Sequence, residues 1–235
     1  MTDNQARNRP QIPVPPFPYT AEELCFESQG VSLCGTLTLP ADSERFPGVV
    51  LVQGSGPHAR DELVFGHPIF LVLANYLTRR GIAVLRYDKR GIGMSGGLYT
   101  ESTVQDFADD ALAVLRFLKT KAQISQTGIV GHSEGGHVAM MVAAHSTDVD
   151  FIVSMAGMAV SGLDIHLSQL GLHLRNTKIS EEIVGRELAL ARERIEILLA
   201  EPDNSAAAIK LLEFFRRNGK LPRSPGLAIY FLSRN

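Results

Sequence analysis

The sequence has no long apolar run, no strong net charge and few cysteines, and these absences exclude several classes of protein. No apolar stretch approaches the roughly 18 residues that a membrane-spanning helix requires, so no transmembrane segment is predicted. The formal net charge of -2 gives no electrostatic basis for binding nucleic acid or an anionic membrane. Residues 1–9 contain no apolar segment typical of a secretory signal. We therefore predict a cytoplasmic protein.

Two cysteines are too few for a disulfide framework. Cys25 and Cys34 flank a turn predicted near Gln29 and Gly30, where the strand register would set them opposite each other. Because nothing in the sequence indicates secretion, we expect two reduced thiols in a strand pair. The seven histidines and the cysteines show neither H-E-x-x-H nor C-x-x-C spacing, so no metal site is predicted.

Composition and length predict a folded protein with a sizeable core. The 235 residues are 45% hydrophobic and 20% charged, which are ordinary values for globular proteins. That length is enough for one α/β domain, alone or with a small appendage. Residues 9–18 hold five prolines, and this composition favours extended, polyproline-like backbone. We therefore predict a proline-rich leader over residues 1–20.

Strand and helix patterns alternate after the leader. Residues 22–27 and 31–39 predict an antiparallel pair, and the short apolar run at 47–52 predicts a strand buried on both faces. Further strands are predicted at 82–87, 127–130 and 151–156, and helices at 67–80, 104–118 and 136–144, the second of them opened by a capping box at 102–105. This alternation predicts an α/β fold, with a doubly wound, mainly parallel sheet flanked by helices.

The pattern changes after Gly157, where helical periodicity replaces the alternation. Three helices are predicted there, at residues 163–174, 180–200 and 205–217. We therefore divide the chain into a core at 21–160 and a helical region at 161–235. The middle helix has a wide apolar surface, which either packs in a core or forms the wall of an acyl pocket.

The strongest functional signal is Gly-His-Ser-Glu-Gly at residues 131–135, centred on Ser133. A predicted strand precedes it and a helix rich in small residues follows it. In the context of strand, sharp turn and helix, G-x-S-x-G lifts a serine hydroxyl above the edge of a sheet as a nucleophile. We therefore predict a catalytic role for Ser133 in preference to a chance match.

Acyl transfer at Ser133 would require backbone N–H groups that stabilise the oxyanion. At such a turn one donor is the residue after the serine, here Glu134. The second comes from the loop after an earlier strand, and residues 53–56 form a glycine-containing break after the strand at 47–52. We predict that the N–H of Ser55 is this second donor.

A second motif, G-x-G-x-x-G at residues 91–96, is typical of dinucleotide-binding sites. In such a site the glycines open a helix directly, and an acidic residue ends the next strand. Here residues 97–101 intervene before the helix, and Asp109 and Asp110 lie inside it. We therefore interpret the glycines as a tight turn after residues 88–90 and predict no cofactor.

Together these segments resemble the α/β-hydrolases of the bacterial serine esterase type, near the dienelactone-hydrolase and acyl-CoA-thioesterase branches. The resemblance spans about residues 20–160 and depends on residues 54–57, 60–62, 81–96, 106–109 and 131–136. It implies that small carboxylic esters are hydrolysed through an acyl-Ser133 intermediate without a cofactor. It also implies a helical cap beginning near Ser161 and a structural role for the loop that contains Asp88 and Arg90.

The sequence departs from this family in the acid and base of the catalytic triad. The family order is Ser, then Asp or Glu, then His, in loops after later strands. Beyond residue 160 the sequence predicts no such strand apart from a weak pattern at 227–232. Asp164 and His166 are too close together in the chain for the usual geometry. We therefore predict a chain truncated at its carboxyl end, with the last strands and part of the cap missing.

Three interpretations stay open on the sequence alone. The chain is an esterase with impaired turnover, a non-catalytic remnant or binding module of the same fold, or an enzyme whose acid and base come from a partner chain. Hydrolysis of a thioester or a peptide is also compatible with the G-x-S-x-G turn at Ser133. Missing strands would leave a sheet edge and apolar helix faces uncovered, so we expect a tendency to form homo-oligomers.

Overall fold

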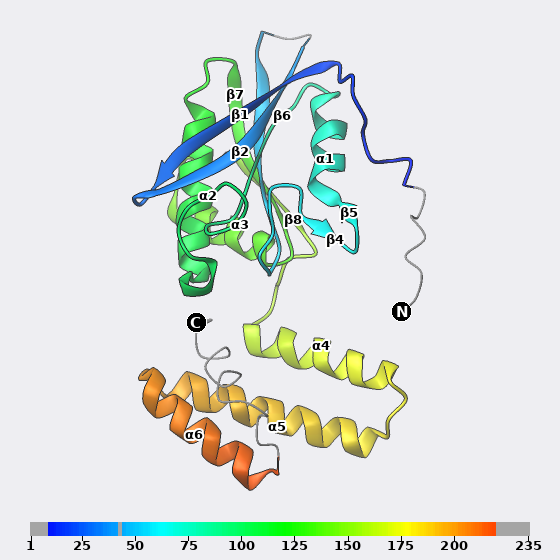
Figure 1. Ribbon diagram of the computed structural model, residues 1–235, viewed down its shortest axis with the longest axis vertical. Helices are drawn as coiled ribbons and strands as arrows, with labels where there is room; N and C mark the ends of the chain where they lie inside the picture. The colour runs from blue at the N-terminus through cyan, green and yellow to red at the C-terminus, as the bar shows by residue number, and fades with distance from the viewer. Residues whose placement is uncertain (1–8, 42–43, 220–235) are drawn as a thin grey trace. The chain divides into compact units, whose positions relative to one another are not determined.

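The computed structural model describes residues 9–41 and 44–219. Contacts divide the chain into two units, Met1–Gly157 and Met158–Asn235. The first unit holds a β-sheet with its covering helices, and the second holds a group of helices (Figure 1). The weak strand pattern at 227–232 lies outside the described residues.

The first unit is built around one mainly parallel sheet, whose strands follow the order β1-β2-β6-β3-β7-β8. These strands are β1 (Tyr19–Ser28), β2 (Val31–Pro40), β3 (Phe46–Val52), β6 (Ala83–Tyr87), β7 (Ile124–His132) and β8 (Phe151–Met155). β6, β3, β7 and β8 run parallel, and the β1–β2 hairpin pairs with β6 in the antiparallel direction. A separate short ribbon contains β4 (Leu63–Val64) and β5 (His67–Pro68).

Helices cover both faces of this sheet (Figure 1). They are α1 (Ile69–Thr78), the 3-10 helix η1 (Tyr99–Glu101), α2 (Val104–Lys119) and α3 (Glu134–His145). In β3, Val50 and Val52 join the core beneath α2 and α3, whereas Val49 and Leu51 pack with residues of α1. This alternation buries β3 on both faces, as its apolar run predicts. The predicted α/β fold with a mainly parallel, helix-flanked sheet is confirmed.

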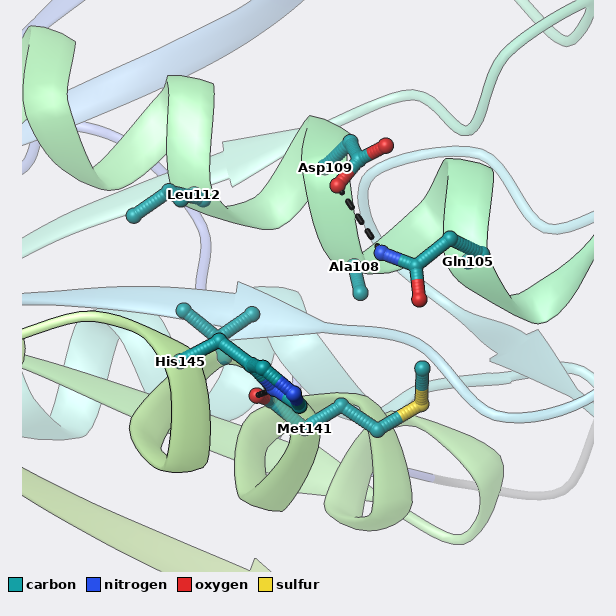
Figure 2. Close-up of a pocket in the computed structure, with 7 residues that line it drawn as sticks. Gln105, Ala108, Asp109, Leu112, Met141 and His145 are labelled. Carbon is teal, nitrogen blue, oxygen red and sulfur yellow. Dashed lines mark hydrogen bonds between the residues drawn. The ribbon is translucent and has the colours of Figure 1, made fainter.

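Two helix starts and one capping box differ from the predicted ones: α3 begins at Glu134, two residues earlier than predicted. α1 begins at Ile69, because His67 and Pro68 pair with β4 in the short ribbon. The capping box of α2 lies one residue later than predicted, since Thr103 accepts from the N–H of Asp106 and the Asp106 carboxylate accepts from the N–H of Thr103. Between α2 and α3 a hollow of about 170 Å³ remains at the surface (Figure 2).

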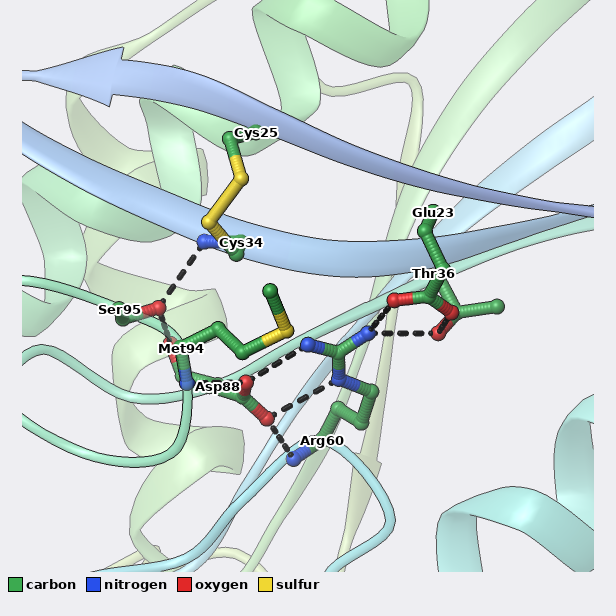
Figure 3. The surroundings of a disulfide bond; sticks show 8 residues. All are labelled: Glu23, Cys25, Cys34, Thr36, Arg60, Asp88, Met94 and Ser95. Atoms are coloured by element: carbon green, nitrogen blue, oxygen red, sulfur yellow. Dashed lines mark hydrogen bonds and ion pairs between the residues drawn. A yellow bond between two sulfur atoms is a disulfide. The ribbon is translucent and has the colours of Figure 1, made fainter.

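The two cysteines form a disulfide, so the prediction of reduced thiols is wrong for this structure. Cys25 of β1 lies directly opposite Cys34 of β2, with the two Cα atoms 4.1 Å apart (Figure 3). Cα atoms more than about 7 Å apart cannot be bridged, and the hairpin register brings these two well inside that limit. The expectation of reduced thiols depended on the redox compartment, whereas the strand register decides the pairing here.

The G-x-G-x-x-G segment at 91–96 forms a turn packed against the loop after β6. Gly91 and Gly93 adopt φ values of +74° and +57°, which L side chains rarely adopt. A Cβ at Gly93 would lie 2.5 Å from Asp88 Oδ2, and one at Gly91 would collide with the backbone of Tyr99. The glycines are therefore explained by close packing within the turn.

The second unit contains α4 (Gly162–Asn176), α5 (Glu181–Ala200) and α6 (Asn204–Arg217). Their bounds agree with the predicted ones to within two residues. A side-chain cap begins each helix: the caps are Ser161, Ser180 and Asp203. α5 packs against both α4 and α6. Ala207 and Leu211 of α6 are buried against partly buried side chains of α5, so part of the apolar surface serves packing within the unit.

Candidate active site

Ser133 lies at the turn between β7 and α3, with φ +52° and ψ -115°. A positive φ is uncommon for a residue other than glycine and persists only where the surroundings hold it. Here the Ser133 N–H donates to Met155 O (2.9 Å) and the Ser133 carbonyl accepts from the Gly136 N–H (3.0 Å). This strained strand-to-helix turn is the backbone geometry typical of a nucleophile elbow.

The glycines of the motif are required by close approach of the backbone. A Cβ on Gly131 would collide with the carbonyl oxygen of Gly135. A Cβ on Gly135 would collide with the carbonyl oxygen of Val52, at the end of β3. The G-x-S-x-G spacing therefore reflects the tight contact of α3 with β7 and β3 behind the serine.

The loop after β3 passes directly beside Ser133. Val52 pairs with Gly131 in the parallel register of β3 and β7, so the two strands end at the same edge of the sheet. A Cβ on Gly54 would lie 3.2 Å from the Ser133 Cβ. The Ser55 hydroxyl donates to Glu134 Oε2 (3.0 Å). The structure therefore brings together all three residues predicted for the site.

In the loop after β3, the N–H of Ser55 has no hydrogen-bond acceptor among the described residues. The other polar backbone groups here have side-chain partners. The Gly54 N–H donates to Glu62, and the Gly54 C=O accepts from Lys89. The Ser55 C=O contacts the ring of His58, and the Gly56 N–H donates to Tyr99. In the described part of the chain, the Ser55 N–H donates to no other residue. The N–H of Glu134, as the first of α3, has no intrahelical acceptor. Among the described residues, neither predicted oxyanion donor therefore has an acceptor.

Two buried side chains lie beneath this loop. Glu62 is fully buried, with φ +46°, and its Oε1 accepts from the Gly54 N–H (2.6 Å) and lies 2.8 Å from His132 Nδ1. Lys89 Nζ donates to Gly54 O (2.7 Å) and to Glu134 Oε1 (3.0 Å). Charged groups therefore contact both residues that flank Ser133.

Asp88 anchors the next loop along the same edge of the sheet (Figure 3). Its carboxylate accepts from the side chain and the N–H of Arg60 and from the N–H of Met94. Burial alone would raise the pKa of Asp88, but these hydrogen bonds outweigh it, so the pKa lies below its ordinary value. Arg90 pairs with buried Asp110 of α2 in the same way. Both residues hold the loop in place, as expected.

Glu62 and Lys89 were not among the site residues predicted from the sequence. Both lie inside segments that carry the resemblance, and both follow strands whose carboxyl ends meet at Ser133. That position was the available signal, because doubly wound sheets gather functional groups at this edge. Local spacing gave no further indication, since Glu62 is 70 residues from His132 and Lys89 is 45 residues from Glu134.

Asp164 and His166 belong to the second unit. The Asp164 carboxylate accepts from Ser161 Oγ (2.7 Å) at the start of α4. Burial and the nearby charge of Arg194 lower the pKa of His166. Asp164 is therefore engaged in helix capping.

The hollow between α2 and α3 is separate from this site, because no elbow residue lines it (Figure 2). Residues 9–41 and 44–219 contain no group of three or more His, Cys, Asp or Glu side chains that would hold a metal ion. Within the same ranges, no helix has the length and apolar character needed to cross a membrane.

A strained serine at the carboxyl edge of a mainly parallel, helix-covered sheet defines the α/β-hydrolase class. Solved structures share this fold. An α/β-hydrolase from Penicillium sp. sh18 matches with a TM-score of 0.53 and 23% identity, over 67% of this chain and 53% of that one. An esterase from Pyrococcus furiosus matches with a TM-score of 0.52 and 22% identity, over 71% of this chain and 59% of that one.

The chain belongs to the family described as serine aminopeptidase, S33, which matches residues 49–197. It is also 35% identical over 134 residues to esterase EstD of Thermotoga maritima. That match covers 56% of this chain and 32% of EstD, so the chain spans about a third of the length of this relative. The resemblance to α/β-hydrolases of the bacterial esterase type is confirmed.

Proposed function

We propose that the protein is a serine hydrolase that cleaves carboxylic esters through an acyl-Ser133 intermediate. Ser133 attacks the ester carbonyl, the alcohol leaves, and water then releases the acid. The N–H groups of Ser55 and Glu134 stabilise the oxyanion in both steps. Small acyl and aryl esters are the proposed substrates.

The observation that carries this proposal is the elbow itself. Ser133 has φ +52° beside a glycine loop, and the open N–H groups of Ser55 and Glu134 come from the two segments that meet there. The choice of ester is supported by the names of two similar proteins, EstD and the Pyrococcus furiosus esterase. No described residue hydrogen-bonds to the Ser133 hydroxyl, so we expect slow turnover from the 235 residues alone. Loss of a triad member leaves about 10³–10⁴-fold catalysis over water.

The test combines a fluorophosphonate probe with an activated phenyl ester. The wild-type chain should be labelled and should release phenol slowly, and Ser133→Ala should lose both reactions. Equal labelling and hydrolysis in the two proteins would show that Ser133 is not the nucleophile. A folded wild-type chain that neither labels nor hydrolyses would instead establish the non-catalytic interpretation.

A second candidate is hydrolysis of amino-terminal peptide bonds, which the family description favours. The elbow and the oxyanion donors would serve an amide as they serve an ester, because both pass through a tetrahedral intermediate. Aminoacyl nitroanilides offered beside the phenyl ester distinguish the two candidates. A higher kcat/KM for the nitroanilide would replace the ester proposal with the peptidase one.

A further inference from the structure

Buried ionisable side chains bind the backbone of Gly54 on both sides, one at its N–H and one at its C=O, which belong to two successive peptide units. The Glu62 carboxyl accepts from its N–H at 2.6 Å, and the Lys89 ammonium donates to its C=O at 2.7 Å. The Glu62 side chain is 1% exposed and that of Lys89 is 3% exposed. Burying an ionisable group costs free energy unless the group is paired, so loss of either contact would be unfavourable.

Each of these side chains also contacts one neighbour of Ser133. Glu62 Oε1 lies 2.8 Å from Nδ1 of His132, the residue before the serine. Lys89 Nζ lies 3.0 Å from Oε1 of Glu134, the residue after it. The Ser55 hydroxyl adds a third link, to the other carboxylate oxygen of Glu134. Side-chain contacts therefore connect His132 and Glu134, the two variable positions of G-x-S-x-G, to the loop that contains Gly54 and Ser55.

We propose that Glu62 and Lys89 are positioning residues that fix the Ser55 N–H relative to the Glu134 N–H. This inference depends on the proposed function, because it assigns these two donors to the oxyanion. We call the arrangement the Gly54 clamp, meaning Glu62 and Lys89 with their contacts to Gly54, His132 and Glu134. Lys89 binds the C=O of the peptide unit whose N–H is that of Ser55, and Glu62 binds the N–H of the peptide unit before it, so the clamp sets the direction of the Ser55 N–H bond.

The surrounding contacts support a positioning role over simple core stabilisation. Glu62 Oε2 is buried and has no hydrogen-bond partner among the described residues. The hydrogen bonds of this carboxyl are therefore those of Oε1 to Gly54 and His132, which belong to the clamp. The backbone of Glu62 adopts φ +46°, a strained conformation that is expected where function constrains geometry. Lys89 Nζ also lies 4.6 Å from the centre of the Phe107 ring, and this cation–π contact helps to orient the ammonium.

The first experiment measures the backbone amides by NMR in the full chain. In the wild type, the Gly54 amide proton should resonate far downfield and exchange slowly, because it donates to a buried carboxyl. Glu62→Ala should lose both properties, and Glu62→Gln, which keeps an acceptor oxygen, should retain most of them. In Lys89→Met the Ser55 and Glu134 amide resonances should shift. If those two resonances stay unchanged in every variant, the clamp does not position them.

The second experiment measures phenyl ester hydrolysis by the same variants. Glu62→Ala and Lys89→Met should lower kcat by about 10- to 100-fold with KM within about twofold, since a displacement near 1 Å costs up to about 10² in rate. Glu62→Gln should recover most of the loss. A fall in kcat that Glu62→Gln does not recover, or a change confined to KM, would overturn the positioning role.

Asp150→Ala is the matched control. The Asp150 carboxylate accepts from the Thr127 N–H at 2.7 Å, so this change also removes a carboxylate that binds a backbone N–H, but near the amino end of β7 and away from Ser133. It should leave kcat unchanged, and a loss of kcat equal to that of Glu62→Ala would show that the clamp variants act only through stability. If Glu62→Ala does not fold, Glu62→Gln and Lys89→Met decide the result. Activity unaffected by Ser133→Ala would refute the proposed function, whereas the amide spectra test the clamp independently.

Discussion

Asp88 shows how one residue can hold a whole loop. Its side chain is 3% exposed, and Arg60 donates to Oδ1 at 3.1 Å and to Oδ2 at 2.7 Å. The N–H groups of Arg60 and Met94 complete the set at 2.8 and 3.0 Å. Paired geometry of this kind favours the ionised carboxylate despite its burial. Asp88 therefore couples the loop after β6 to the segment that carries Arg60.

We expect Asp88→Asn to lower the free energy of unfolding by about 2 kcal/mol at pH 7, as for hydrogen bonds to charged groups. Because the pKa of Asp88 is lowered in the folded protein, its stabilisation is complete above the unfolded value of about 3.9. It is lost as pH falls through the lower folded pKa. Urea unfolding of both proteins between pH 7 and pH 3 measures the difference. A difference that does not shrink below pH 4 would contradict the assignment.

At the residue scale, the sequence points to positions whose signal is local. Ser133 and Glu134 are adjacent, and the glycines around Ser55 mark a break after a buried strand, so all three were predicted from motifs, and the structure brings them together. Their catalytic roles stay predictions. Glu62 and Lys89 contact residues 70 and 45 positions away, and only the register of β6, β3 and β7 brings them there. No local spacing encodes that register, which explains why sequence reasoning missed them.

At the scale of secondary-structure elements, the β1–β2 hairpin carries two kinds of cross-link. The disulfide joins its strands at Cys25 and Cys34. The N–H of Cys34 donates to Ser95 Oγ, which donates in turn to the carbonyl of Asp88. The hairpin is thus tied to the loop after β6 as well as to itself (Figure 3). Helix and strand positions were predicted well here because periodicity is local, while this pairing required knowledge of the hairpin register.

Reduction of the disulfide should destabilise the protein. Closing a loop with a sequence separation of 9 residues is worth about 2.5 kcal/mol in the chain-entropy treatment. For a chain of this size that corresponds to about 5–10 °C in Tm. Thermal unfolding with and without dithiothreitol should show this decrease in the wild type. The double variant Cys25→Ser, Cys34→Ser should not respond to dithiothreitol. Two titratable thiols in the untreated wild type would contradict the pairing.

At the scale of the whole molecule, the two edges of the sheet differ in character. β8 pairs only with β7 in the described sheet, and its Phe151 and Val153 are exposed. β1 at the other edge carries Glu22, Glu23 and Glu27, and charges of this kind oppose edge-to-edge pairing. The β8 edge is therefore the one expected to associate.

We expect the wild-type chain to associate as its concentration rises, and Val153→Lys to shift it toward the monomer, because a charged edge disfavours pairing with another strand. Sedimentation velocity over a concentration series measures both. Glu22→Lys is the control at the opposite edge and should leave the association unchanged. A wild-type chain that stays monomeric, or a Val153→Lys chain that associates equally, would rule out assembly through β8.

The parallel register of β3 and β7 also has a consequence for folding kinetics. Ser55 and Glu134 are separated by 79 residues, yet their side chains meet only when the two strands are paired. Pairing of distant strands requires the loop-closure entropy to be overcome before any contact compensates for it, so it is slow compared with helix formation. We therefore expect the proposed nucleophile Ser133 and the loop that carries Ser55 to come together late in folding. A collapsed intermediate that already contains α2 and α3 would still lack the geometry for acyl transfer.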